Sequence, residues 1–333
     1  MGKEQCKTRH LHNMFEVSSL VQKAIRRQDA QMAYYAANEL IPSYRNYLWK
    51  RLLTVSAEDC FDLVTGEIVK LHNKDNDEQD DKNIAKAVSI LLNCRKNRDA
   101  DFFACNLLNS RDEADITSYI PEPVKDDTCA TKNGHCMFDL ARVFKEAIDR
   151  LDDKMAGYAA NELRVYYRQF TWKTILMKAR EIGIQQVTNE IRYLKEADES
   201  TKETSTIFLS KAIVVLLKIA RHRNVDMFNF NFRFNDTIDL RQYNEKMFVL
   251  PQYIYDCHTF IGKRNGKTKK NFVVTEQAAL RPLCEGDYDH SSWEHYFWLC
   301  ENGFYREEYT PHPDKKRMKE LQSGAVQLNL FGE

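Results

Sequence analysis

The string YAANEL occurs twice, at residues 35–40 and at residues 158–163, and the segments around it decide the fold. MFEVSSLVQKAIRRQDAQMAYYAANEL, which starts at Met14, aligns without a gap with MFDLARVFKEAIDRLDDKMAGYAANEL, which starts at Met137. The match continues through Trp49 and Trp172, and it resumes later in AKAVSILL and SKAIVVLL. Each repeat spans roughly a hundred residues, an ordinary domain size. The sequence therefore predicts two copies of one module.

Each module has the pattern of a helical unit. Apolar residues recur at spacings of three and four between Phe15 and Ile25, which gives one apolar helix face. Asp29 and Asp152 are expected N-caps of a second helix that carries YAANEL. We expect a third helix around Trp49 or Trp172 and a fourth around AKAVSILL or SKAIVVLL. YAANEL itself is interpreted as packing residues rather than as a binding surface used twice.

Two acidic or polar stretches interrupt this pattern. HNKDNDEQDDKN, residues 72–83, and ADESTKETS, residues 197–205, contain few apolar residues. Such composition is typical of solvated connectors. We therefore expect a mobile loop in each module at these places.

Composition limits the class of protein. The chain has 333 residues, 43% of them hydrophobic and 29% charged, with 49 basic and 49 acidic residues. The zero net charge predicts no partner, so a nucleic-acid contact would need a local patch. Nine scattered cysteines indicate free thiols in a reducing cytoplasm, and no segment looks like a signal peptide or a membrane span. Only 11 glycines and 7 prolines favour an all-α fold.

The expected organisation follows from these patterns. Tandem helical modules are followed by a small mixed or helical region that is rich in aromatic and basic residues. The expected segments are an N-terminal extension (1–13), the first module (14–112), a linker (113–136), the second module (137–234), the aromatic and basic region (235–320) and a flexible tail (321–333).

The segment YDCHTFIGKRNGKTKKNF, residues 255–272, combines aromatic and basic residues. This mixture suits phosphate contact with base stacking, although a solvated turn with a hydrophobic anchor has the same composition. GKRNGKT, at 262–268, is one residue short of a P-loop and is not expected to bind a nucleotide. Asp256, His258 and Thr259 form a candidate functional motif that could instead orient a loop. The candidate nucleic-acid-binding residues are Lys263, Arg264, Lys267, Lys269 and Lys270.

Two other groups were weighed for metal binding or catalysis. Cys129, His135 and Cys136 lie close in sequence, but zinc needs a fourth ligand, which only Cys6, His10 or His12 could supply over a long range. The second group is Asp287, Asp289, His290, Glu294 and His295, as a nuclease-like acidic cluster. We favour the alternative that Asp289 and Ser291 cap a helix whose Trp293, Phe297 and Trp298 pack inward. No catalytic residue, metal or cofactor is therefore expected.

The first module resembles a known family. Ala24, Ile25, Arg26 and Asp29 are followed by Ala33, Tyr34 and Tyr35, then by Lys50, Arg51 and Leu52, and by Ser56, Glu58 and Asp59. This pattern resembles the helical C-terminal region of RarA/MgsA, the replication-associated AAA+ ATPases related to clamp loaders. The resemblance covers residues 14–110 and, more weakly, 137–232. The string from Asp256 to Thr268 also looks like one in phage and mobile-element relatives of that region.

What the resemblance implies is limited by a departure. The sequence contains no GxxxxGK[ST] motif. The resemblance therefore implies the scaffold of such a machine, with a clamp-loader collar-like fold and a capacity for self-association, but without the motor.

QLNLF, at residues 327–331, resembles the clamp-binding peptide of bacterial replication and repair proteins. Gln327 matches the polar anchor, Leu328 and Leu330 the leucines, and Phe331 the terminal aromatic. Burying Leu330 and Phe331 in an apolar groove would contribute about 1.5–3 kcal/mol each before ordering costs. The tail therefore predicts docking on the bacterial sliding clamp.

Together these features predict a cytoplasmic, non-catalytic replication or repair protein of a bacterium, a phage or a mobile element. Its expected partners are the sliding clamp, a clamp loader or RarA-type ATPase, DNA and a second copy of itself, with no membrane. Two alternatives stay open at this point. One is a clamp-tethered DNA-processing enzyme that uses Asp256, His258 or residues 287–295. The other is an inhibitor of host replication or defence.

Overall fold

The computed structural model describes residues 6–109, 115–120, 129–131, 133–201, 206–232, 238–289 and 291–302. Every regular element in these ranges is helical, and the β-structure among them is limited to isolated bridges. The all-α prediction is therefore confirmed. None of the helices in the described ranges combines the length and the apolar character needed to cross a bilayer.

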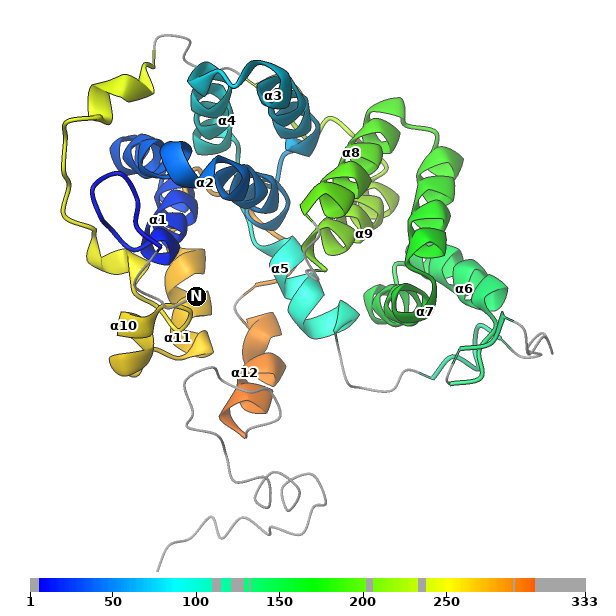
Figure 1. Ribbon diagram of the computed structural model, residues 1–333. Coiled ribbons are helices and arrows are strands. Elements are labelled where there is room, and N and C mark those ends of the chain that lie inside the picture. The colour runs from blue at the N-terminus through cyan, green and yellow to red at the C-terminus, as the bar shows by residue number, and fades with distance from the viewer. Residues whose placement is uncertain are drawn as a thin grey trace, which may run out of the picture.

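Two groups of four helices lie side by side (Figure 1), with a short helix between them. The first module contains α1 (Met14–Arg26), α2 (Ala30–Glu58), α3 (Thr65–Glu78) and α4 (Asp81–Asn93). The second contains α6 (Met137–Arg150), α7 (Asp153–Ile182), α8 (Gln185–Thr201) and α9 (Ile207–His222). Between them lie α5 (Asp99–Phe103) and a π-helical turn, η2 (Ala104–Leu108). The remaining elements are η4 (Leu240–Tyr243), η5 (Gln252–Ile254), α10 (Phe260–Arg264), α11 (Lys269–Ala278), η6 (Ser291–Trp293) and α12 (Glu294–Glu301).

Residues 123 positions apart make the same local contacts. The Asp29 side chain accepts a hydrogen bond from Met32 N at 3.2 Å, and Asp152 accepts one from Met155 N at 3.0 Å. Both predicted N-caps are thus confirmed. YAANEL packs inward as expected, since Ala159, Ala160 and Leu163 and their counterparts in α2 have no exposed surface.

The predicted third helix corresponds to the second arm of a bent helix in each module. The backbone of Tyr44 (φ −135°) in α2 and of Tyr167 (φ −140°) in α7 leaves the helical region, so each long helix bends there. Trp49 and Trp172 lie in the second arm of these bent helices. Helical geometry is therefore interrupted between the arm that carries YAANEL and the arm that carries the tryptophan.

The predicted acidic loops are wrong for the described residues. α3 continues through Glu78 and α8 through Thr201, so residues 72–78 and 197–201 are helical. Asp75 is buried and accepts a hydrogen bond from the Trp49 indole at 2.6 Å, and Arg45 binds the same carboxylate. Asp198 does the same with the Trp172 indole, at 2.8 Å. A single buried acceptor in each segment ties it to the preceding helix, which composition could not show.

The correspondence also extends upstream of Met14 and Met137. Thr8 donates to the buried Glu39, and Thr131 donates to the buried Glu162. Antiparallel bridges join residues 7 and 13 and residues 130 and 136. The turn between them needs positive φ, 62° at Leu11 and 80° at Gly134, which only glycine adopts freely. Each module is therefore preceded by a small loop that docks on its YAANEL helix.

The segment after residue 238 runs along the first module (Figure 1). Tyr253 donates to the N-cap Asp29 at 2.9 Å, and the Arg27 guanidinium lies 4.5 Å from its ring centroid. In the second module, Tyr119 donates to Asp152 at 2.9 Å, and Arg150 lies 4.5 Å from that ring. The two tyrosines thus make the same contacts with the two modules from different segments of the chain. In both segments an isoleucine follows the tyrosine, at 120 and at 254.

Candidate functional site

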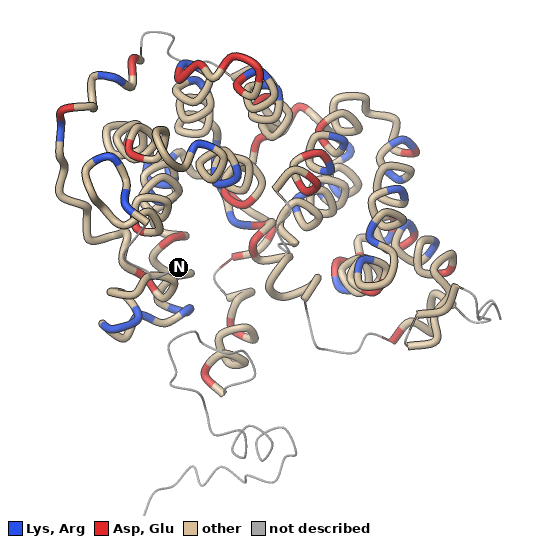
Figure 2. The backbone as a smooth tube through the Cα atoms, in the orientation of Figure 1, with Lys and Arg blue, Asp and Glu red and all other residues tan. Residues whose placement is uncertain are grey.

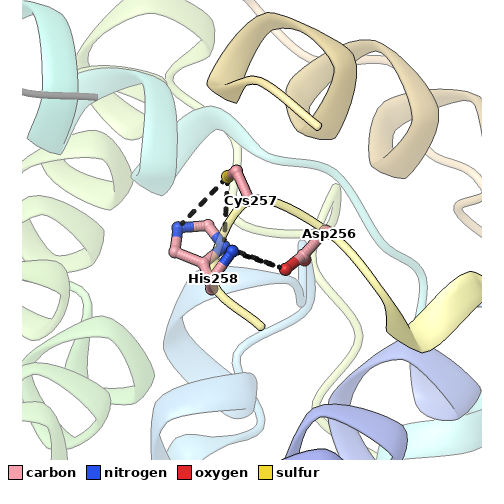
Figure 3. A group of neighbouring side chains, drawn as sticks. All are labelled: Asp256, Cys257 and His258. Carbon is pink, nitrogen blue, oxygen red and sulfur yellow. Dashed lines mark hydrogen bonds and ion pairs between the residues drawn. The ribbon is translucent and has the colours of Figure 1, made fainter. Parts of the chain in front are cut away.

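The Asp256–Thr259 turn lies against α1 and joins η5 to α10 (Figure 3). The His258 backbone N–H donates to Asp256 Oδ1 at 2.8 Å, and the His258 ring lies 3.4 Å from the same oxygen. The Lys23 ammonium binds the other oxygen, Asp256 Oδ2, at 2.5 Å. One carboxylate oxygen of Asp256 therefore closes the turn, and the other holds the turn on α1.

The charges in this turn follow from these contacts. Burial alone would raise the pKa of Asp256, but the bond with His258 and the charge of Lys23 hold it well below its ordinary value. Burial would lower the pKa of His258, but the bond with Asp256 outweighs it and raises that pKa to about 10. Half of the His258 side chain is exposed, and its ring meets Phe272 edge-on at 4.8 Å. The pair is charged at neutral pH and acts as an anchor.

A metal ion is a poor fit for this turn. One potential ligand atom from each of Asp256, Cys257 and His258 lies within 4.8 Å of the others. They are consecutive residues, however, and the Lys23 ammonium already neutralises the carboxylate. A cation would have to displace that lysine.

Thr259 and Gly262 explain the rest of the motif. The Thr259 hydroxyl accepts from Asp256 N and from Gly262 N, both at 3.1 Å, so it closes the turn and caps α10. A Cβ atom at Gly262 would lie 1.9 Å from the carbonyl oxygen of Asp256. Only glycine allows this approach of two backbone segments. The threonine and the glycine are therefore required by the packing of the turn.

The string GKRNGKT forms a helix, a turn and a helix start. Gly262 lies in α10, Gly266 has a positive φ of 71°, and Thr268 caps α11 in a reciprocal capping box with Asn271. The P-loop requires a loop of backbone N–H groups after a strand. The expectation that no nucleotide cradle forms here agrees with this arrangement.

Basic residues cluster along the backbone of α10 and the start of α11 (Figure 2). Arg264 and Lys267 are exposed, and so is Phe260, with 74% of its surface accessible. Lys270 is exposed too, but it pairs with Glu301 of α12 at 3.0 Å. Lys263 and Lys269 are partly covered. The structure thus brings the five predicted basic residues onto one small corner of the chain.

A buried network of charges holds α11 on the first module. Arg26 has 1% of its side chain exposed and binds Asp59 and Glu58 at 2.8 Å and Glu276 at 3.1 Å. Glu276 also pairs with Arg27 at 2.8 Å. Burial would raise the pKa of Glu276, but the hydrogen bond and charge of Arg27 and the charge of Arg26 lower it to about 2. These residues lie far apart in sequence, and sequence reasoning did not detect the network.

The proposed zinc ligands do not form a metal site. The sulfur atoms of Cys129 and Cys136 are 2.8 Å apart, and His135 is engaged by Glu162 at 3.0 Å. The only cluster of three potential metal ligands in the described part of the chain is the one at Asp256. Two thiolates on tetrahedral zinc would be roughly 3.8 Å apart, given Zn–S bonds of about 2.3 Å. The zinc alternative is therefore not supported by geometry.

The acidic cluster at 287–295 does not converge either. Asp287 pairs with Lys218 and Arg221 of α9 at 2.9 and 2.6 Å. Asp289 accepts from Ser291 and Ser292 and so caps the 3-10 turn η6. The N-cap of α12 is Trp293, without a side-chain capping bond, so the capping prediction holds for the turn and not for the helix. Trp293 and Phe297 are buried as expected, but Trp298 is half exposed, contrary to the expectation, and stacks against His295. Glu294 is exposed, and His290 lies outside the described residues.

A cavity of about 340 Å³ opens between the two modules. Asp101 of α5, Cys105 of the π-helical turn and Asn109, which follows that turn, line the cavity together with Arg164 of α7. The buried Arg164 Nε has no hydrogen-bond partner, and burial lowers the pKa of Arg164. π-Helical turns are frequent at functional sites. The carboxylates of Glu58 and Asp101 in the same wall are, however, already paired with Arg26 and Arg98.

The predicted clamp-binding residues Gln327, Leu328, Leu330 and Phe331 lie outside the described residues. No known protein family matches the chain, and neither a curated protein nor a solved structure shows significant similarity to it. The resemblance to the RarA/MgsA helical region therefore stays a prediction from the sequence.

Proposed function

We propose that this chain is a non-catalytic scaffold that docks on the bacterial sliding clamp through residues 327–331 and acts at replication forks. The observation that carries the proposal is the peptide QLNLF itself. It joins two apolar anchors, Leu330 and Phe331, to a polar residue, Gln327, at the spacing of a peptide that enters an apolar groove. The paired helical modules provide the body that such a tether would bring to the clamp.

The contacts of three candidate catalytic carboxylates support a scaffold rather than an enzyme. Asp256 is paired with Lys23, Asp287 with Lys218 and Arg221, and Asp289 caps a turn. A catalytic carboxylate needs a free face toward a substrate. In the part of the chain that the structure describes, these three carboxylates hold segments of the fold together.

Surface plasmon resonance on immobilised sliding clamp tests the docking. The full chain is compared with Gln327→Ala/Leu330→Ala/Phe331→Ala and with a matched control in the same tail, Leu321→Ala/Gln322→Ala/Ser323→Ala. We expect micromolar or tighter binding by the chain and the control, and at least a tenfold loss in the first variant. Equal binding by all three proteins, or no binding by the full chain, contradicts the proposal.

A second function, nucleic-acid contact, is favoured by the corner at α10 and α11. Arg264 and Lys267 are exposed next to Phe260, which pairs phosphate-binding groups with a ring that can stack on a base. Arg264→Ala/Lys267→Ala should weaken binding of single-stranded DNA and reduce the slope of log K against log salt by about 1.4. Lys173→Ala/Arg180→Ala, two exposed positions on α7, is the matched control. An unchanged slope would rule out this corner as the contact.

A further inference from the structure

Two sulfur atoms at the entrance to the second module lie unusually close together. Cys129 Sγ and Cys136 Sγ are 2.8 Å apart, and the side chains are almost fully buried. A disulfide bond measures about 2.05 Å, so only a small movement separates the two thiols from bonding distance. An isolated antiparallel bridge joins Ala130, the neighbour of Cys129, to Cys136, so the two cysteines lie at the two ends of one small loop. From this geometry we propose that Cys129 and Cys136 form an oxidation site that closes to an intramolecular disulfide.

The position of Cys136 makes it the attacking thiol. It is the N-cap of α6, a helix of 14 residues, and its side chain makes no capping hydrogen bond. Its sulfur therefore occupies the place where a helix usually has a side-chain capping acceptor. In the first module the same position holds Asn13, whose side chain accepts a hydrogen bond from Phe15 N at 2.9 Å. The second module therefore has a sulfur where the first has a conventional cap.

The repeat also shows that the pair is specific to one module. Cys6 lies 123 residues before Cys129, but the counterpart of Cys136 is Asn13, so the first loop cannot form the bond. Both loops have the same bridge, the same turn with positive φ and the same threonine bond to a buried glutamate. The loop of the first module thus has the same structure as the loop of the second module but lacks the second cysteine.

A second close pair provides a contrast. Cys60 Sγ and Cys94 Sγ are 2.9 Å apart, with about 1% of each residue exposed. They lie next to the ends of α2 and α4 in the core, so an oxidant reaches them only after helices separate. The 129–136 loop is held by two backbone bonds, Thr131 N to His135 O at 2.8 Å and Gly134 N to Thr131 O at 2.9 Å, and by the bonds of Thr131 and His135 with Glu162. Opening this loop disrupts far less of the structure, so the two pairs should differ in oxidation rate.

The reaction balances with a small disulfide such as glutathione disulfide as oxidant. The Cys136 thiolate attacks one sulfur of the oxidant, and one glutathione thiolate leaves. The Cys129 thiol then loses its proton and attacks Cys136 Sγ in the mixed disulfide, which releases the second glutathione. The two cysteines lose two protons and two electrons, and the oxidant is reduced to two glutathione molecules.

The test uses the full chain, reduced and then equilibrated with mixtures of reduced and oxidised glutathione. After an acid quench and alkylation under denaturing conditions, trypsin should release DDTCATK linked to NGHCMFDLAR by a disulfide. The peptides LLTVSAEDCFDLVTGEIVK and AVSILLNCR, which carry Cys60 and Cys94, should remain alkylated at the same glutathione ratio. Oxidation should also raise the midpoint of thermal unfolding by a few degrees.

Variants separate the site from general thiol reactivity. Cys136→Ser should abolish the linked peptide and the thermal shift, whereas Cys6→Ser should leave both unchanged. The proposal is overturned if Cys129 and Cys136 stay alkylated, or carry only glutathione, while Cys6 reacts. It is also overturned if the Cys60–Cys94 link forms at the same rate as the Cys129–Cys136 link in folded protein.

Discussion

Glu190 of α8 caps the first turn of α3, in the other module, through the backbone N–H of Thr65. One carboxylate oxygen accepts from Thr65 N at 2.7 Å, and the other accepts from Gly66 N at 3.0 Å. The N-cap residue of α3 itself, Val64, makes no side-chain capping bond. A Cβ at Gly66 would lie 2.7 Å from the Tyr193 ring, so the two helices meet at a glycine. At the module junction, the N-terminus of α3 is therefore capped by a side chain from the other module.

Removing this cap should loosen the junction. Glu190→Ala leaves two buried N–H groups without an acceptor, and we expect it to cost about 2 kcal/mol of unfolding free energy. Urea denaturation measures the loss. Gln186→Ala, at an exposed position on the same helix, is the control and should cost less than about 0.5 kcal/mol. Equal effects of the two substitutions would show that the cap contributes nothing.

The buried aspartate of α3 should be far more sensitive than its acidic neighbours. Asp75→Ala removes the acceptor for the Trp49 indole and the buried partner of Arg45, so we expect a loss of about 3 kcal/mol. Asp77→Ala changes an exposed residue of the same acidic string and should be nearly neutral. Chemical denaturation with tryptophan fluorescence reports both values. A similarly large loss in Asp77→Ala would contradict this prediction. It would show that the charge of the acidic string matters, and not the burial of Asp75.

Acid should weaken the attachment of α11. The pKa of Glu276 is about 2 in the folded chain, below the ordinary value of 4.5. A depressed carboxyl pKa contributes stability that is present above about pH 4.5 and is lost as the pH falls toward 2. The shift corresponds to about 3 kcal/mol for this buried group. Glu276→Gln should therefore flatten the fall in unfolding free energy between about pH 5 and pH 3.

The two N-caps of the module entrances offer a reciprocal test under reducing conditions. Cys136→Asn supplies α6 with the acceptor that Asn13 supplies to α1, and it should stabilise the chain by about 0.5–1 kcal/mol. Asn13→Ala should cost about 1 kcal/mol. Differential scanning fluorimetry in a reductant compares the two. A destabilised Cys136→Asn variant would show that the sulfur contributes packing that outweighs the cap.

The turn between η5 and α10 should tolerate no side chain at Gly262. Gly262→Ala places a methyl group against the Asp256 carbonyl, and we expect a loss of about 2 kcal/mol or more, with faster proteolysis of the 255–272 segment. Gly266→Asn is the matched control because its position is open and asparagine tolerates the positive φ. Similar proteolysis of both variants would contradict the close backbone approach.

Local patterns in the sequence were enough for the helical class and for much of the helix order. Asp29 and Asp152 were predicted as N-caps because capping depends on residues only three positions away. Asp289 was predicted as a cap for the same reason. The prediction of mobile loops at 72–83 and 197–205 was wrong for the described residues. Composition cannot distinguish Asp75 and Asp198, which are buried acceptors, from their exposed neighbours.

The sequence by itself determined that the chain contains a repeat, that its elements are helices and where the two YAANEL helices start. These properties depend on periodicity and capping, which act within a few residues. Only the tertiary structure decided that Glu190 caps α3, that Glu276 joins Arg26 and Arg27, and that Tyr119 and Tyr253 occupy equivalent places on the two modules. Each of these contacts joins a buried polar group to a partner from another element. Burial makes an unpaired polar group costly, and which partner is available depends on how the helices pack rather than on the residues nearby in the chain.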